Sequence, residues 1–176
     1  MLIDCHGHLD TYSNLEVSKV LDRGKTVGVE YIVSAGTTLD SSRRSVELSS
    51  LFSGLLSAVG LHPMNIRGPV DCTIYEELIG LARSSDKVVA ISEIGLDYLN
   101  GAPERAIQYQ AFREQIRLAR ELSLPIIFHS RKAHRDVLRV LREERAYEVG
   151  GAMHYFQADE DTARETMDLG FYISLA

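Results

Sequence analysis

Seven short apolar runs alternate with helical stretches along the chain, and this alternation constrains the fold more than any other feature of the sequence. The runs have the length and composition of strands and cover residues 2–5, 29–35, 55–63, 88–93, 125–129, 150–154 and 171–174. The stretches between them are predicted to be helices over residues 15–27, 39–51, 73–84, 103–122, 133–145 and 161–169. Strands separated by helices pair in parallel through right-handed crossovers.

Local signals mark the ends of several predicted helices. Gly28 and Gly170 are expected to end the first and the last helix. Asp40 or Ser41 is expected to cap the second helix, and Pro103 fits the first turn of the long helix over residues 103–122.

Two architectures fit this order of elements: an open doubly wound sheet and a (β/α)₈ barrel. No Gly-x-Gly-x-x-Gly motif follows the first strand, so a dinucleotide-binding fold loses support. Five of the six histidines, together with Glu93, fall at the C-terminal ends of predicted strands or just beyond. A barrel gathers these ends in a ring around its active site, whereas an open sheet spreads them along a line. We therefore predict an α/β fold, a TIM-type (β/α)₈ barrel.

Length and cysteine content limit the organisation further. A chain of 176 residues suits a single domain over residues 1–176 and is too short for two ordinary ones. Cys5 and Cys72 do not make a disulfide framework, so a cytoplasmic location is expected. Cys5 is predicted to be a small buried residue that faces away from the neighbouring histidines. No signal peptide or membrane span is apparent, because the longest apolar runs have only a few residues.

The net charge of −6 excludes the broad basic surface that is typical of nucleic-acid-binding proteins. Arginines do cluster near residues 113–120 and 131–145, but there they alternate with glutamates at helical spacing and indicate solvated helix faces. Any nucleic-acid substrate would therefore bind at a local site, with metal ions supplying the positive charge.

His6 and His8 form the first part of a candidate metal site. Residues two apart on a strand point to the same face, so both imidazoles aim at one point where the first strand ends. Neutral imidazole is a ligand for Zn, Mn, Fe and similar ions. The pair alone is weak evidence, because histidine pairs also occur in turns and caps.

Further ligand candidates end the later strands. Glu93, His129 and His154 end the fourth, fifth and sixth predicted strands. A semi-buried carboxylate such as Glu93 is costly without a cation partner. The set is too large for one tetrahedral ion with an open position, and it suits two ions that share Glu93 as a bridge. Two such ions can clamp the attacking and leaving oxygens of a phosphoester.

These segments resemble the TatD family of metal-dependent deoxyribonucleases, within the amidohydrolase-type barrels. The matching segments are residues 4–10 (DCHGHLD), 60–63 (GLHP), 92–98 (SEIGLDY), 125–131 (PIIFHSR), 151–156 (GAMHYF) and 169–174 (LGFYIS). The resemblance implies a hydrolase that cleaves phosphodiester bonds of DNA, single-stranded or at its ends, by a two-metal mechanism with Mg, Mn or Zn.

The resemblance also implies roles for individual residues. One metal ion would bind His6, His8 and Glu93, and the other would bind Glu93, His129 and His154. Glu93 would also be the catalytic residue. His62 and Arg131 would line the substrate pocket.

The chain departs from the family pattern at two places. Tyr155 follows His154 where the family usually has cysteine. The chain also stops at Ala176, where family members continue through strands seven and eight and supply an aspartate ligand. A full barrel has about 250 residues. We therefore expect a domain that is incomplete at its C-terminus, truncated after about strand seven, and that self-associates through the open barrel edge.

Two alternative functions remain open. A two-metal site at the barrel rim is equally consistent with a related ester or amide hydrolase, such as an aminoacyl-tRNA deacylase or a lactonase-like amidohydrolase, since fold does not determine substrate. The other alternative is an inactive metal-binding partial barrel. Turnover of phosphodiester against ester substrates distinguishes the deoxyribonuclease from the related ester or amide hydrolase. Metal content of the purified chain tests the inactive partial barrel.

Overall fold

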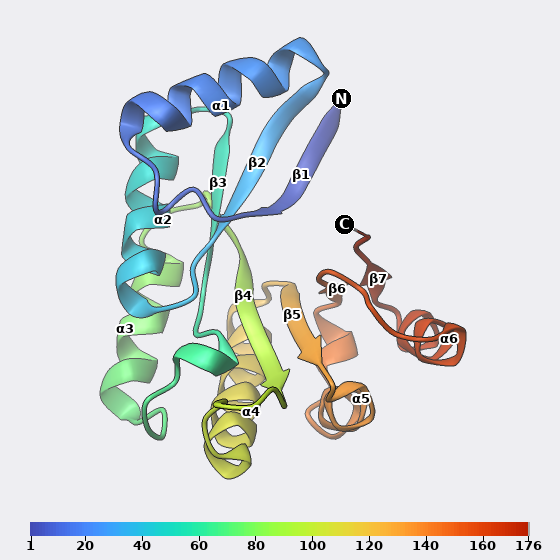
Figure 1. Cartoon of the computed structure of the whole chain (residues 1–176). Coiled ribbons are helices and arrows are strands. Elements are labelled where there is room, and N and C mark those ends of the chain that lie inside the picture. Colours follow the sequence, from blue (N-terminus) through green and yellow to red (C-terminus); the bar gives the residue numbers. More distant parts are fainter. Residues whose placement is uncertain (176) are drawn as a thin grey trace.

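A parallel sheet of seven strands forms the centre of the protein (Figure 1). The structure is a computed structural model and describes residues 1–175. The strands are β1 (Leu2–Gly7), β2 (Val29–Ala35), β3 (Leu55–Val59), β4 (Val88–Asp97), β5 (Ile126–Arg131), β6 (Gly151–Met153) and β7 (Tyr172–Ile173). They lie side by side in chain order, and each neighbouring pair is parallel.

Helices connect the strands and cover the outer side of the sheet (Figure 1). They are α1 (Asn14–Thr26), α2 (Leu39–Leu51), α3 (Cys72–Arg83), α4 (Arg105–Leu122), α5 (His134–Glu143) and α6 (Glu160–Asp168), with short 3₁₀ turns η1 (Pro63–Asn65) and η2 (Ala146–Glu148). Each predicted helix is present. None of the helices described is long and apolar enough to cross a membrane.

The order of the strands distinguishes between the two predicted architectures. A doubly wound sheet reverses its strand order at a switch point. Here the order runs from β1 to β7 without reversal. The sheet curls into a half-barrel of the TIM type with helices outside, which confirms the predicted fold class.

The starts of two helices differ from the sequence prediction. Thr38, rather than Asp40 or Ser41, caps α2, because its side chain accepts the backbone N–H of Ser41. The Ser41 hydroxyl in turn accepts the N–H of Thr38, and this reciprocal pair satisfies two N–H groups at the helix end. Pro103 lies just before α4, whose N-cap is Glu104, so it does not occupy the first turn.

Strands β1, β4 and β5 extend beyond their predicted ends, whereas β3, β6 and β7 are shorter than predicted. β4 continues four residues past Glu93, because Ile94 to Asp97 pair with β5. β5 likewise continues to Arg131. β3 ends at Val59, and Pro63 begins a 3₁₀ turn instead of closing the strand. Glu93 is therefore inside its strand and not at its end.

The main core lies between the central strands and α4 and α5. Ile91, Phe112, Ile116 and Phe128 are among its fully buried side chains. The sheet is thus held most firmly around β4 and β5, the two strands that carry Glu93 and His129.

α2 packs against the sheet through small polar side chains. Ser42, Ser45 and Ser49 are fully buried on one face of this helix. Ser42 bonds to the backbone of Gly60, while Ser45 and Ser49 bond to serines of β2 and β3. Because these side chains are short and paired, the helix lies close to the sheet without leaving buried polar groups unpaired.

The prediction that Cys5 is buried is wrong. Cys5 is exposed, as are Leu2 and Ile3 on the same strand. β1 forms one edge of the sheet, and α1 packs chiefly on β2, so little within residues 1–175 covers β1. Tyr172 at the opposite edge is also exposed. Self-association through these edges stays a prediction.

Candidate metal centre

The first histidine pair converges as its spacing predicts. His6 lies in β1 and His8 just beyond it, and their Nε2 atoms are 3.3 Å apart. Each Nε2 is 3.5 Å from Oε2 of Glu93. The Nδ1–H of His8 donates to the carbonyl oxygen of Ala35 at 3.1 Å, which leaves the Nε2 lone pair facing the site.

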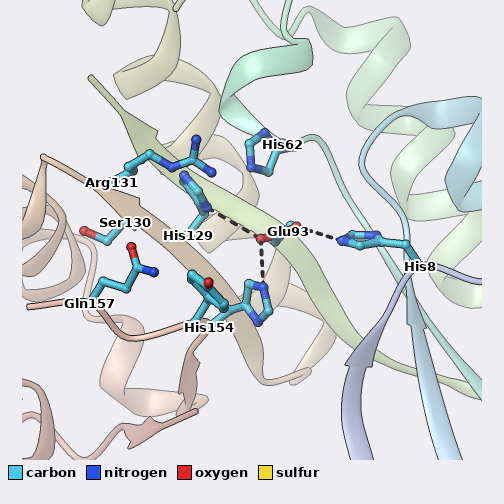
Figure 2. A pocket seen from close by; sticks show the side chains of 9 residues that line it. His8, His62, Glu93, His129, Ser130, Arg131, His154 and Gln157 are labelled. Atoms are coloured by element: carbon cyan, nitrogen blue, oxygen red, sulfur yellow. Dashed lines mark ion pairs between the residues drawn. The ribbon is translucent and has the colours of Figure 1, made fainter. Parts of the chain in front are cut away.

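The other oxygen of Glu93 faces a second pair of histidines. Nδ1 of His129 is 3.6 Å from Oε1, and Nε2 of His154 is 3.7 Å from the same atom. Figure 2 shows Glu93 between His8 on one side and His129 and His154 on the other. Each carboxylate oxygen therefore faces a separate pair of imidazoles.

Glu93 is ionised in spite of its burial. Only 4% of the residue is exposed, and burial by itself raises the pKa of its carboxyl. The contacts with the ring nitrogens of His129 and His6 outweigh that effect and lower its pKa well below the ordinary value. The centre of the site thus carries a negative charge.

Asp97 orients His129 and was not identified from the sequence as a site residue. It is fully buried in β4, and its Oδ2 accepts a hydrogen bond of 2.9 Å from Nε2–H of His129. Oδ1 accepts the backbone N–H of Leu99. Because Asp97 holds the Nε2–H, Nδ1 of His129 is the ring nitrogen that faces Glu93 and would bind a metal ion, as in the carboxylate–histidine–metal arrangement of many metal sites.

His62 lies beyond β3, although the sequence prediction placed it within that strand, and it contacts the site through its ring. The ring lies edge-on to His129, with 4.5 Å between the centroids. Burial, and then the proximity of His129, lower the pKa of His62 to about 4, so the ring is neutral at pH 7. Nδ1 accepts the backbone N–H of Met64 at 3.1 Å, and the neutral ring therefore carries its proton on Nε2.

Arg131 lies at the end of β5. Its Nε is 3.5 Å from Oδ2 of Asp97, and about half of its side chain is exposed. The guanidinium is therefore anchored near the site while its outer nitrogens remain accessible to a ligand.

His154 comes directly after β6 and stacks on His6. Their ring centroids are 3.6 Å apart, with 27° between the planes. Burial, and then the proximity of His6, lower the pKa of His154 to about 4. The His154 ring is thus neutral at pH 7, and the buried Nδ1 atoms of His6 and His154 have no hydrogen-bond partner among the described residues.

Three successive backbone carbonyls, at the last residue of β2 and just beyond it, hold three of these residues. Ala35 accepts from the His8 ring, Gly36 accepts the N–H of Glu93, and Thr37 accepts the N–H of His62. Gly36 has no room for a side chain, because a Cβ there would lie 2.7 Å from Cα of Ser42. One short segment of main chain therefore sets the positions of ligand candidates from three different strands.

These residues surround a cavity of about 420 Å³. All of the predicted site residues except His6 line it, and the lining is completed by Ser130, Tyr155 and Gln157 (Figure 2). Sequence reasoning did not assign these three. Ser130 and Tyr155 adjoin predicted site residues in the chain, Gln157 lies three residues after His154, and that proximity was the only available signal.

The donor atoms fit divalent metal ions. Two ligands about 2.1 Å from a tetrahedral ion lie about 3.4 Å apart. The contacts among His6, His8 and Glu93 are 3.3 to 3.5 Å, and these three form one compact group of candidate ligands. A second compact group contains Glu93 and His129 with His62, instead of His154. The protonated Nε2 of His62 makes it a poorer ligand than His154, whose Nε2 faces Glu93.

The comparisons with known proteins agree with this geometry. The family model described as "TatD related DNase" matches residues 3–176. The chain is 40% identical over 177 residues to the "Uncharacterized metal-dependent hydrolase YabD" of Bacillus subtilis, covering 99% of this chain and 68% of that protein. It is 34% identical over 157 residues to the "3'-5' ssDNA/RNA exonuclease TatD" of Cronobacter sakazakii, covering 89% of this chain and 59% of that protein.

A solved structure gives the same result. The crystal structure of YJJV, a TatD homologue from Escherichia coli, superposes with a TM-score of 0.87 at 29% identity, covering 98% of this chain and 66% of that one. The chain spans about two thirds of the length of the first relatives it matches.

Proposed function

Since the chain belongs to the TatD family of metal-dependent hydrolases, we propose that it hydrolyses phosphodiester bonds at the ends of single-stranded nucleic acid. The proposed site binds two divalent ions, Mg, Mn or Zn. His6, His8 and Glu93 hold one ion, and Glu93, His129 and His154 hold the other.

The arrangement of Glu93 is the observation that carries this proposal. Its two oxygens face two different pairs of imidazoles at 3.5 to 3.7 Å. A carboxylate that serves two ions in this way is typical of two-metal hydrolases. The buried, ionised state of Glu93 supports the same role, because an unpaired buried charge is costly.

The chain's own residues supply binding and orientation. Bound divalent ions supply positive charge at the phosphate and lower the pKa of water. The Nε2–H of His62 and the guanidinium of Arg131 reach the cavity as donors for phosphate oxygens. Asp97 acts through His129 as a positioning residue.

Two observations favour a strand end over a long duplex. The net charge of −6 offers no extended basic surface, so contacts concentrate at the cavity. The relative from Cronobacter sakazakii is named as an exonuclease on single-stranded DNA and RNA with 3′ to 5′ polarity. We extend both properties to this chain as part of the proposal.

A labelled single strand tests the proposed function. The 176-residue chain, supplied with Mg²⁺ or Mn²⁺, should shorten a 5′-labelled DNA or RNA strand in single-nucleotide steps. The Glu93→Gln variant should not shorten the strand. Hydrolysis of aminoacyl esters or lactones without any phosphodiester cleavage would overturn the proposal in favour of the related ester hydrolase. Stoichiometric metal binding without turnover of any of these substrates would favour the inactive partial barrel.

A further inference from the structure

Tyr155 places an aromatic ring beside the candidate metal centre. It follows His154 directly and lines the 420 Å³ cavity. Its ring centroid is 6.0 Å from that of His154, with 42° between the planes. Half of the residue is exposed. A flat apolar surface is therefore available to a ligand that enters the cavity.

The fold itself gains little from this ring. Tyr155 belongs to none of the apolar clusters of the described residues, and its hydroxyl makes no hydrogen bond with them. Its backbone has φ of 48°, in the left-handed region that favours glycine. A bulky residue in this conformation is uncommon and is found more often at functional sites than elsewhere.

The side chains around the cavity offer little positive charge for binding a nucleic-acid strand, and an aromatic ring can add affinity of another kind. Of the residues that line it, Arg131 alone carries a permanent positive charge. The chain as a whole has a net charge of −6. Beyond the one phosphate that the proposed metal ions would hold, contacts with the other phosphates of a strand would be weak under these conditions. Stacking of bases on aromatic side chains supplies affinity that does not depend on charge or on base identity.

We propose that Tyr155 is a stacking platform for the terminal nucleobase of a single-stranded substrate whose phosphodiester lies at Glu93. The inference rests on the proposed function and adds a specificity element to it. The ring favours an unpaired terminal base, because a paired base is held by its partner and its stacked neighbour and cannot rotate out of the duplex toward the tyrosine. It discriminates little among the bases, since each one presents a π-face.

Binding of a fluorescent strand tests the platform without turnover. The probe is a short DNA strand with 2-aminopurine at its 3′ end and a phosphorothioate at the terminal linkage, in Mg²⁺. Stacking quenches 2-aminopurine. Tyr155→Phe should retain the quenching and the affinity, whereas Tyr155→Ala should lose the quenching and bind about 5- to 100-fold more weakly. Tyr147 is similarly exposed and lies in η2, outside the cavity lining, so Tyr147→Ala is the matched control.

A second measurement separates this inference from the proposed function. Strands with a normal or an abasic 3′-terminal nucleotide are compared in kcat/KM. The wild-type chain should prefer the normal strand by about 5- to 100-fold, and Tyr155→Ala should remove that preference while still cleaving the abasic strand. Equal preference in both chains would overturn the platform and leave the nuclease function standing. Absence of any cleavage, with quenching intact, would count against the nuclease function and still support the platform.

Thermal unfolding excludes a merely structural role. Because glycine adopts the left-handed region without strain, Tyr155→Gly should melt at the wild-type temperature or above it. A large loss of stability would show that the ring supports the fold, and would overturn the inference.

Discussion

The carboxylate of Asp97 holds Nε2 of His129 at 2.9 Å and thereby turns Nδ1 of that ring toward Glu93. Asp97 itself is fully buried in β4. The pair connects two neighbouring strands, and it fixes both the tautomer and the rotation of a candidate ligand.

Replacing Asp97 by asparagine should weaken one metal site and spare the other. The asparagine carbonyl can still accept from Leu99, while its NH₂ group favours the wrong tautomer of His129. We expect the affinity for one Mn²⁺ to fall by about 10- to 100-fold, measured by titration calorimetry. The ion held by His6 and His8 should bind as in the wild type.

Asp136→Asn provides the control for this measurement. Asp136 accepts hydrogen bonds from Tyr98 and Arg139 and contacts none of the candidate ligands. Its replacement should leave both affinities unchanged. Equal weakening in the two variants would show that Asp97 acts through general stability and not through His129.

Glu93→Gln should reduce the content of both metal ions. Glu93 alone faces both histidine pairs, and the neutral amide removes charge from each site. His6→Ala removes a contact on the Oε2 side only. Metal analysis of the purified chains should therefore show a larger loss in Glu93→Gln than in His6→Ala. The bridging role is wrong if Glu93→Gln keeps full stoichiometry while His6→Ala loses metal.

Acid should destabilise the metal-free chain through His62 and His154. Each has a pKa of about 4 in the folded state, lowered from 6.5. The unfolded chain therefore takes up protons first as the pH falls. The free energy of unfolding should decline from about pH 6.5 to about pH 4, by about 3 kcal/mol for the well-buried His62. Glu93 adds to the loss only below about pH 4.5, the ordinary value of its carboxyl pKa.

Urea unfolding in EDTA across this pH range measures the effect. His62→Gln should flatten the decline in part, and the double variant with His154→Gln should flatten it further. An unchanged slope in the double variant would contradict the neutral, buried state of both rings.

Gly36→Ala should disrupt the site together with the fold around it. A Cβ at Gly36 would meet the Cα of Ser42, which cannot move without shifting α2. We expect a loss of stability of about 1–3 kcal/mol, together with weaker metal binding. Gly68→Ala is the control, since no atom lies within 4 Å of its added Cβ, and it should be neutral or slightly stabilising. Ser42→Ala should not rescue Gly36→Ala, because the Cα of residue 42 remains in place.

The sequence was sufficient to predict the fold class and the convergence of the histidines. Strand-to-helix alternation gave the parallel order, and the two-residue period of a strand placed His6 and His8 on one face. The clustering of Glu93, His129 and His154 followed from their positions along neighbouring strands.

Other features depended on pairing between segments that are distant in the chain. Asp97 was missed because Gly95 interrupts the β pattern, whereas in the structure Gly95 pairs with His129 and the strand continues. The spacing of four between Glu93 and Asp97 was the available signal, since residues four apart on a strand share a face. The exposure of Cys5 depends on which helices reach β1, and that is decided by tertiary packing.

The carbonyls of Ala35, Gly36 and Thr37 also have a consequence for dynamics. Since one segment holds His8, Glu93 and His62, a thermal displacement of that segment moves all three side chains in the same direction. We therefore expect the distances among His8, Glu93 and His62 to change less than their individual positions when this segment shifts, so that the spacing of these groups in the site is kept.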